Sequence, residues 1–159
     1  MLPALRDLHA NLAWLHDQIK AIVSDLEPSQ LDWKPAPAWN SIAQLVAHTA
    51  DSERYWTGEV VGGEATGRER DAAFAVSRLD AAALCDLLDD ALAVSERALE
   101  NVTPADLDRD YTDGPGGPVT AMGPLAHALE HTAIHTGHIE LMRDLLMERD
   151  TEASGGGAA

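Results

Sequence analysis

The sequence predicts an all-α protein folded as a four-helix bundle, and three observations support this prediction. Apolar residues make up 45% of the 159-residue chain but aromatic residues only 4%, so compact side chains must fill the interior, a composition that favours helices over sheets. Leucine, isoleucine and valine recur at spacings of three and four in four separate segments, which places them on one face of a helix in each segment. Stretches rich in glycine and proline separate these segments.

The first helix is predicted for residues 2–26. Its apolar stripe consists of Leu5, Leu8, Leu12, Leu15, Ile19, Ile22 and Leu26. Pro28 ends the helix, and residues 27–40 form a loop rich in proline and tryptophan. We interpret His9 and His16 as surface residues of this amphipathic helix.

The second helix is predicted to begin at Asn40 or Ser41, either of which suits an N-cap. The apolar residues along it are Ile42, Leu45, Val46, Tyr55 and Trp56. The glycine pair at 62–63 stops the helix. Residues 64–79, which follow, are polar and almost without periodicity.

The third helix is predicted to begin at the N-cap Asp80 and to end near Val102. Its apolar stripe consists of Leu84, Leu87, Leu88, Leu92 and Leu99. Cys85 lies on the same apolar side, so we interpret it as a small buried residue rather than a nucleophile.

The fourth helix is predicted to occupy most of residues 120–149, with Thr120 as a candidate N-cap. Pro124 is tolerated because it falls in the first turn of this helix. Residues 103–119 precede the helix and contain five glycine or proline residues between positions 114 and 118, which fix a turn.

Residues 1–150 are predicted to form one domain, and residues 151–159 a disordered tail of low complexity. The inter-helix connections of about 14 to 18 residues are longer than the turns common in bundles, so they could cross the bundle or line its open end. We expect residues 27–40 and 103–119 to form the walls of a pocket.

Charge and cysteine content exclude several classes of function. The net charge is −16, from 27 acidic and 11 basic residues, which argues against binding to nucleic acid or to anionic membranes. Cys85 is the one cysteine and cannot form an internal disulfide. The chain has neither the pattern of a signal peptide at its start nor an apolar run long enough to span a membrane, so we expect a cytoplasmic protein.

The fourth predicted helix carries a stripe of histidines, namely His127, His131, His135 and His138. At 100° per residue these four lie within roughly 80° of one another, and pairs at i,i+4 bring two imidazoles within reach of the same ion. A third ligand must come from another helix, and His48 in the second helix is the natural candidate. The alternative is a set of packed or hydrogen-bonded imidazoles, but a core-facing row of histidines is poorly satisfied without an ion.

Two segments resemble the DinB-like family of metal-binding four-helix bundles. The segment from Trp39 to Ile42, followed by His48, resembles the Trp-Ser-Ile-like opening that leads to a histidine in the family's second helix. Residues 127–139 resemble the family's fourth helix, in which His-x-x-x-His precedes a Gly-Gln-Ile-like stretch. The resemblance places His131 and His135 on the family's metal positions and implies that they bind the ion together with His48.

Three neutral imidazoles suit one divalent ion per chain, either Zn²⁺, Ni²⁺ or Fe²⁺, and leave positions open for water or substrate. Such an ion can activate water, or it can convert a bound thiol to its thiolate. A zinc protease of the His-Glu-x-x-His type is disfavoured, because Thr132 follows His131 where that motif needs a glutamate. Asp51, one turn beyond His48, is the best-placed candidate for a general base, although it is also interpretable as an ordinary solvated carboxylate.

The resemblance implies a thiol S-transferase that activates a low-molecular-weight thiol, such as bacillithiol or mycothiol, against small electrophiles. A hydrolase that activates water and a non-catalytic, metal-binding dimeric bundle are the alternatives. Family bundles commonly pair through their helices, so the resemblance also implies a homodimer. Trp14 or Trp56, if exposed, would be compatible anchors, although core packing is the favoured role for both. His127 and His138 could each be a fourth ligand, a substrate contact or a partner of a ligand.

Overall fold

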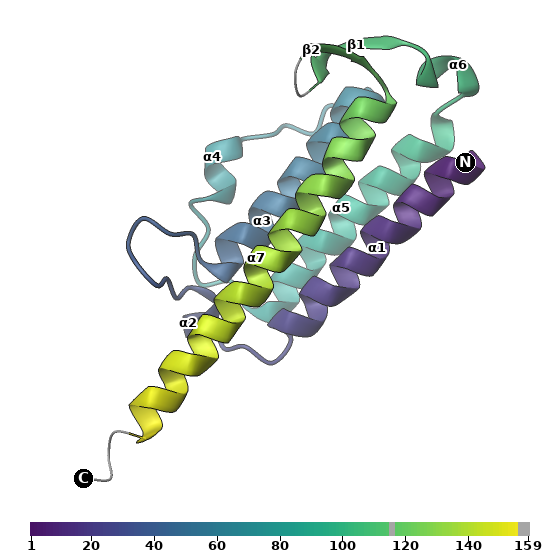
Figure 1. Cartoon of the computed structure of the whole chain (residues 1–159). Helices are drawn as coiled ribbons and strands as arrows, with labels where there is room; N and C mark the ends of the chain where they lie inside the picture. The colour runs from purple at the N-terminus through teal and green to yellow at the C-terminus, as the bar shows by residue number, and fades with distance from the viewer. Residues whose placement is uncertain (115–116, 156–159) are drawn as a thin grey trace.

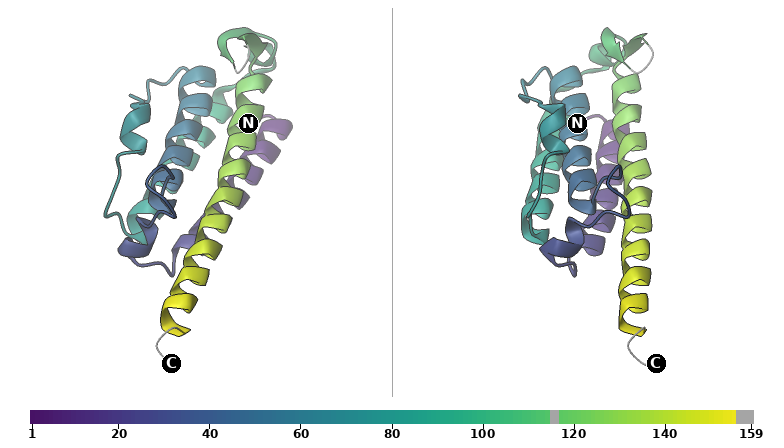
Figure 2. Two further views of the ribbon diagram at one scale, coloured as in Figure 1. Left: turned by 60° about the vertical axis from the view of Figure 1, so that its left-hand side comes forward. Right: turned by 90° about the vertical axis from the view of Figure 1, so that its left-hand side faces the viewer.

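The computed structural model describes residues 1–114 and 117–155 and confirms the all-α four-helix bundle (Figure 1). The four long helical segments are α1 (Pro3–Val23), α3 (Ile42–Glu53) continued by η1 (Arg54–Val61), α5 (Ala81–Asn101) and α7 (Met122–Gly155). They pack side by side, and the C-terminal end of α7 extends beyond the others (Figure 2). The loops between them contain three short helices and one small hairpin.

Helix α1 follows its leucine stripe, with Leu5, Leu12 and Ile19 fully buried against α5 and α7. It ends at Val23, three residues before the predicted end. Pro28 does not lie in an open loop but begins the short helix α2 (Pro28–Leu31). Proline is well suited to this first helical position, because its missing N–H would have had no partner there.

Ser41 is the N-cap of α3, rather than Asn40. The amide of Gln44 donates to Ser41 Oγ over 3.3 Å, and the Ser41 amide donates to Gln44 Oε1 over 3.2 Å, which completes a capping box. From Arg54 the helix widens into the π-helix η1, which ends at Val61 with Gly62 as its C-cap, as the glycine pair predicts. Gly58 lets η1 approach α5 closely, because a Cβ atom there would lie 2.5 Å from Val94 Cγ1.

Helix α5 begins at the predicted N-cap, where Asp80 Oδ1 accepts a hydrogen bond of 2.8 Å from the Ala83 amide. Helix α7 begins at Met122, and Pro124 lies in its first turn as predicted. The prediction of Thr120 as the N-cap of this helix is wrong, because Thr120 ends a β-strand.

That strand belongs to a two-stranded antiparallel hairpin that the sequence did not predict. Strands β1 (Asp110–Gly114) and β2 (Gly117–Thr120) pair around the predicted glycine- and proline-rich turn. The short helices α4 (Arg70–Ala73) and α6 (Pro104–Leu107) complete the structure. Figure 1 shows α4 on the outside of the bundle, and α6 and the hairpin at the end where the N-terminus lies.

The predicted boundary between domain and tail lies inside helix α7. Residues 151–155 continue the helix, and residues 156–159 lie outside the described part of the chain. Among the described residues, no helix combines the length and the apolar character needed to cross a membrane.

The apolar core is divided into two clusters with a polar layer between them. One cluster surrounds Ile19, Leu88 and Leu146, and the other surrounds Leu12 and Leu125. The polar layer consists of the buried residues His16, Glu53, Thr57 and Ser95. Because these four come from α1, α3, η1 and α5, the layer joins three of the four long segments of the bundle.

Glu53 is the centre of this polar layer. Its Oε2 lies 2.7 Å from His16 Nε2, and neither side chain is exposed to solvent. Ser95 Oγ donates to Glu53 Oε1 over 2.7 Å, and Thr57 Oγ1 donates to the Glu53 carbonyl over 2.7 Å. The interpretation of His16 as a surface residue is therefore wrong, because a carboxylate on a neighbouring helix provides a partner for its imidazole inside the core.

The substitution His16→Ala is expected to lower the free energy of unfolding by about 3 kcal/mol, because it leaves the Glu53 carboxylate buried without its imidazole partner. The control is His9→Ala on the same helix, where the ring is partly exposed and makes one long contact of 3.4 Å with the Leu92 carbonyl. We expect this control to cost less than about 1 kcal/mol. Urea unfolding followed by tryptophan fluorescence measures both values, and equal losses would contradict the role assigned to His16.

Candidate metal centre

Three histidines from two helices converge on one point. His48 lies on α3, and His131 and His135 lie one turn apart on the facing side of α7. One nitrogen from each ring can be chosen so that all three nitrogens lie within 4.8 Å of one another. The structure thus brings together the three residues that the sequence predicted as metal ligands.

The spacing of these nitrogens fits a shared metal ion. His48 Nε2 lies 3.1 Å from His131 Nε2. Two nitrogens bound to one ion at about 2.0–2.1 Å are separated by about 2.9 Å at a right angle and by about 3.3 Å at the tetrahedral angle. The observed separation falls between these two values, and the His135 ring lies 4.4 Å from the His131 ring and 5.1 Å from the His48 ring, measured between centroids.

Electrostatics keep the three imidazoles neutral. Burial, assisted by the neighbouring imidazoles, lowers the pKa of His131 to about 3 and that of His135 to about 4. The pKa of His48 is also lowered, first by burial and then by the guanidinium groups of Arg68 and Arg70. Neutral imidazoles have a free lone pair for a metal ion, so binding at neutral pH displaces no proton from them.

Neighbouring aromatic rings contact two of the three histidines, His48 and His135. The Phe74 ring stacks on His48 at 4.4 Å between centroids, with the planes 31° apart. His138 Nδ1 lies 3.3 Å from His135 Nδ1, which leaves the Nε2 atom of His135 for an ion. Such a contact to the second ring nitrogen orients a ligand imidazole and fixes its tautomer.

His127, at the other end of the stripe, has a different environment. Its ring lies 5.7 Å from the His131 ring and 4.9 Å from the Trp56 ring, measured between centroids. Within the described residues, the group that can share one ion contains neither His127 nor His138. The histidine stripe therefore consists of a pair that converges with His48, and one flanking ring on each side.

Asp51 lies one turn beyond His48 as expected, and its carboxylate has a partner. Arg68 Nε donates to Asp51 Oδ2 over 2.9 Å, and both side chains are largely buried. The Arg68 guanidinium also lies 4.5 Å above the centre of the Tyr55 ring. In the structure, therefore, Asp51 holds an arginine beside the histidines.

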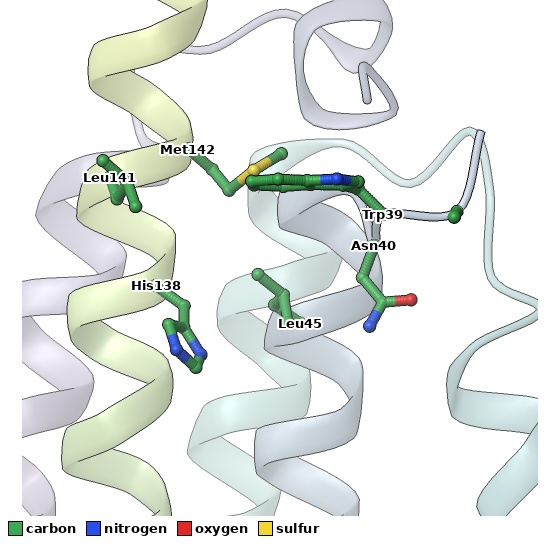
Figure 3. A pocket seen from close by; sticks show the side chains of 7 residues that line it. Trp39, Asn40, Leu45, His138, Leu141 and Met142 are labelled. Atoms are coloured by element: carbon green, nitrogen blue, oxygen red, sulfur yellow. The ribbon is translucent and has the colours of Figure 1, made fainter. Parts of the chain in front are cut away.

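One cavity is lined by His48 and His131, and a second is lined by His138, whose ring contacts His135. The first has a volume of about 340 Å³ and combines histidine, arginine and tryptophan side chains: His48, Ser52, Trp56, Arg68, Arg70, His127 and His131. The second has a volume of about 350 Å³ and is more apolar, with walls from Ala38, Trp39, Asn40, Leu45, His138, Leu141 and Met142. In Figure 3, the Met142 side chain of α7 extends toward the Trp39 indole, which comes from the loop before α3.

Comparison with known proteins agrees with the fold and with this arrangement of helices. Residues 11–139 match the DinB superfamily. The chain belongs to the DinB superfamily. No curated protein matches the sequence.

Solved DinB-like structures share the fold at low sequence identity. A conserved protein from Enterococcus faecalis is 18% identical with a TM-score of 0.72, and the match covers 93% of this chain and 99% of that one. A DinB-like protein from Bacillus subtilis is 22% identical with a TM-score of 0.66, covering 87% of this chain and 91% of that one. A mycothiol-dependent maleylpyruvate isomerase is 17% identical with a TM-score of 0.62, covering 85% of this chain but only 60% of the isomerase.

The DinB resemblance did not reveal which residues form the cavity walls. The loop 27–40 provides one wall, as predicted. In the segment 103–119, by contrast, Asp106 and Arg109 line a separate cavity, and the wall beside the histidines comes from Arg68 and Arg70. The sequence feature that could have identified this wall is the pair Arg68 and Arg70, two positions apart in a chain with only 11 basic residues.

The substitution His131→Gln is expected to reduce the pH dependence of stability in the metal-free protein. Burial lowers the pKa of His131 from 6.5 to about 3 in the folded state, so between these values the unfolded chain binds more protons than the folded chain. The wild type therefore loses stability from this group as the pH falls below about 6.5, whereas glutamine does not titrate. Urea unfolding in the presence of a chelator, at about pH 7 and about pH 4.5, measures both losses. Equal losses in the two proteins would show that His131 is not held neutral.

Proposed function

We propose that this DinB protein is a metal-dependent enzyme that holds one divalent ion, Zn²⁺, Ni²⁺ or Fe²⁺, at His48, His131 and His135. The observation that carries the proposal is the convergence of three neutral imidazoles, two of which line a cavity. Three protein ligands leave at least one position on the ion open, which is the arrangement of catalytic rather than structural sites.

The proposed reaction is the transfer of a low-molecular-weight thiol to a small electrophile. When bound, the ion supplies a Lewis-acid site at which a thiol loses its proton. The isomerase with the same fold depends on mycothiol, which supports a thiol partner for this chain as well. The cavity lined by His48 and His131 also offers space for a reactant beside the proposed ion.

A protein thiol is a poor candidate for the nucleophile. Cys85 lies on α5, is only partly exposed and packs against the apolar core. Burial raises the pKa of the Cys85 thiol, which keeps it in the less reactive protonated form. The thiol of the proposed reaction is therefore a separate small molecule.

A hydrolase that activates water remains the alternative function, with Asp51 as its proposed general base. For this role the Asp51 carboxylate would have to give up the hydrogen bond that it accepts from Arg68 Nε in the structure.

For the proposed homodimer, Trp14 on α1 is an available surface residue, because 59% of it is exposed. Trp56, by contrast, is half-buried beside His127. The cavity lined by His48 and His131 argues against a purely structural metal site.

The substitution His48→Ala is expected to remove most of the bound metal, because it removes the ligand contributed by α3 and leaves only the i,i+4 pair on α7. Elemental analysis should find about one divalent ion per chain in the wild type and only a small fraction of that in the variant. His9→Ala is the matched control, since this histidine lies on α1 outside the cluster, and it should retain the wild-type metal content. Wild-type metal content in the His48→Ala protein would show that the site is assigned wrongly.

The substitution Cys85→Ser is expected to leave thiol transfer within about twofold of the wild type, because the transferred thiol is not part of the chain. The assay follows the consumption of a thiol, first bacillithiol and then mycothiol, with a small electrophile by the metal-loaded protein. Complete loss of turnover, with circular dichroism and metal content unchanged, would assign the nucleophile to Cys85 and overturn the proposed mechanism.

A further inference from the structure

The first of the two cavities has positive charge in a strongly acidic protein. The chain has 27 acidic and 11 basic residues, yet two of its arginines, Arg68 and Arg70, line the cavity beside His48 and His131. Both guanidinium groups are close enough to lower the pKa of His48. The cationic character of this cavity comes from its two arginines, whose guanidinium groups are always charged.

Arg68 is held in a fixed position. Its Nε donates to Asp51 over 2.9 Å, its guanidinium stacks over Tyr55, and only 16% of its side chain is exposed. A guanidinium has five N–H donors, and only the one on Nε is bonded among the residues that the structure describes. The donors on its two terminal nitrogens therefore remain available for a ligand.

Arg70 is the more accessible of the two arginines. It is exposed at the start of α4, and within residues 1–114 and 117–155 it forms neither a hydrogen bond nor an ion pair. Most other arginines of the chain pair with a carboxylate, as Arg54 does with Asp90 and Arg97 with Glu64. An arginine that lines a cavity without a carboxylate partner, in a protein with an excess of carboxylates, is well suited to bind one from a ligand.

The remaining wall is aromatic and polar. The rings of Trp56 and His127 meet edge to face at 4.9 Å between centroids, and Ser52 lies in the same lining. A volume of about 340 Å³ is large enough for a small molecule that places an anionic end at the arginines and an uncharged part against the indole.

We propose that this cavity binds a small molecule through its carboxylate, which is held by Arg70 and by the terminal nitrogens of Arg68. The planar guanidinium fork matches a carboxylate in two parallel hydrogen bonds, and such charge-assisted pairs are stronger than neutral ones. The inference rests on the proposed function in treating the cavity as part of the active site. The carboxylate belongs either to the electrophile or to the thiol, and the chemistry of recognition is the same for both.

The test is the dissociation constant of simple carboxylates for the metal-loaded, full-length protein, measured by calorimetry. Succinate serves as the thiol-free probe and succinamide as its uncharged counterpart; N-acetylcysteine and its amide form the matching thiol pair. We expect the acid of at least one pair to bind more tightly than its amide, and Arg70→Met to weaken that acid about tenfold. The pair that responds identifies whether the electrophile or the thiol carries the carboxylate.

The control is Arg6→Met, which removes an exposed arginine from α1 and should leave every dissociation constant unchanged. The inference is overturned if neither acid is weakened by Arg70→Met, or if inorganic phosphate binds the wild type as tightly as the preferred acid.

Failure of the inference and failure of the proposed function can be distinguished by measuring metal content in each protein. Full metal content with unchanged carboxylate binding in Arg70→Met would overturn this inference and leave the proposed metal site intact. The opposite outcome is a wild type that contains no metal while Arg70→Met still weakens carboxylate binding. That result would overturn the proposed function and leave the anion site intact.

Discussion

The packing of α3 against α7 is the constraint on which the candidate site depends. It brings His48 Nε2 within 3.1 Å of His131 Nε2, so that His48 is buried and His131 and His135 are partly shielded from water. Burial without an added partner is costly for such groups, which is why their pKa values fall so far below that of a solvated histidine. A metal ion at the proposed site would offset this cost by using the lone pairs that burial has left free. Desolvation therefore lowers the stability of the metal-free fold, but it also keeps the imidazoles in the neutral form that can bind an ion.

The position of α3 is fixed from its other side by the polar layer around Glu53. His16 and Ser95 approach the two oxygens of this carboxylate from α1 and α5, and a buried carboxylate must keep these partners. A shift of α3 by one residue would break both contacts. The π-helix η1 begins directly after Glu53 and changes the direction of the side chains that follow. Thr57 of η1 thereby contacts Ser95 on α5. The polar layer thus gives the bundle a register that leucine packing alone specifies poorly.

The fold was more predictable from the sequence than the cavity walls, and the reason is physical. Leucine stripes and caps such as Asp80 are local patterns, so the four helices could be predicted from single segments. The three histidines of the candidate metal site could be predicted because a histidine pair at i,i+4 is also local and His48 was the natural candidate on another helix; the resemblance then implied all three as ligands. The burial of His16 could not be predicted, since it depends on a carboxylate 37 positions away on another helix (53 − 16 = 37). The position of Arg68 in the cavity wall could not be predicted for the same reason. The loop that contains Arg68 has no periodicity, and contacts with α3 and η1 set the position of its side chain.

The protein surface is strongly negative, whereas the cavity is lined by two arginines, and this difference in charge affects which ligands the site would bind. A net charge of −16 repels anions, but in physiological salt this repulsion extends only about 8 Å from each charge. Inside the cavity the arginines act at contact distance and in a less polar medium, where their attraction for a carboxylate is stronger than any effect of the distant surface. Neutral imidazoles add no charge of their own, so the arginines and a bound ion would be the positive groups that a ligand meets there. An acidic surface is therefore compatible with a site for small anions. It disfavours the binding of large polyanions, because most of such a molecule stays outside the cavity and close to the acidic surface.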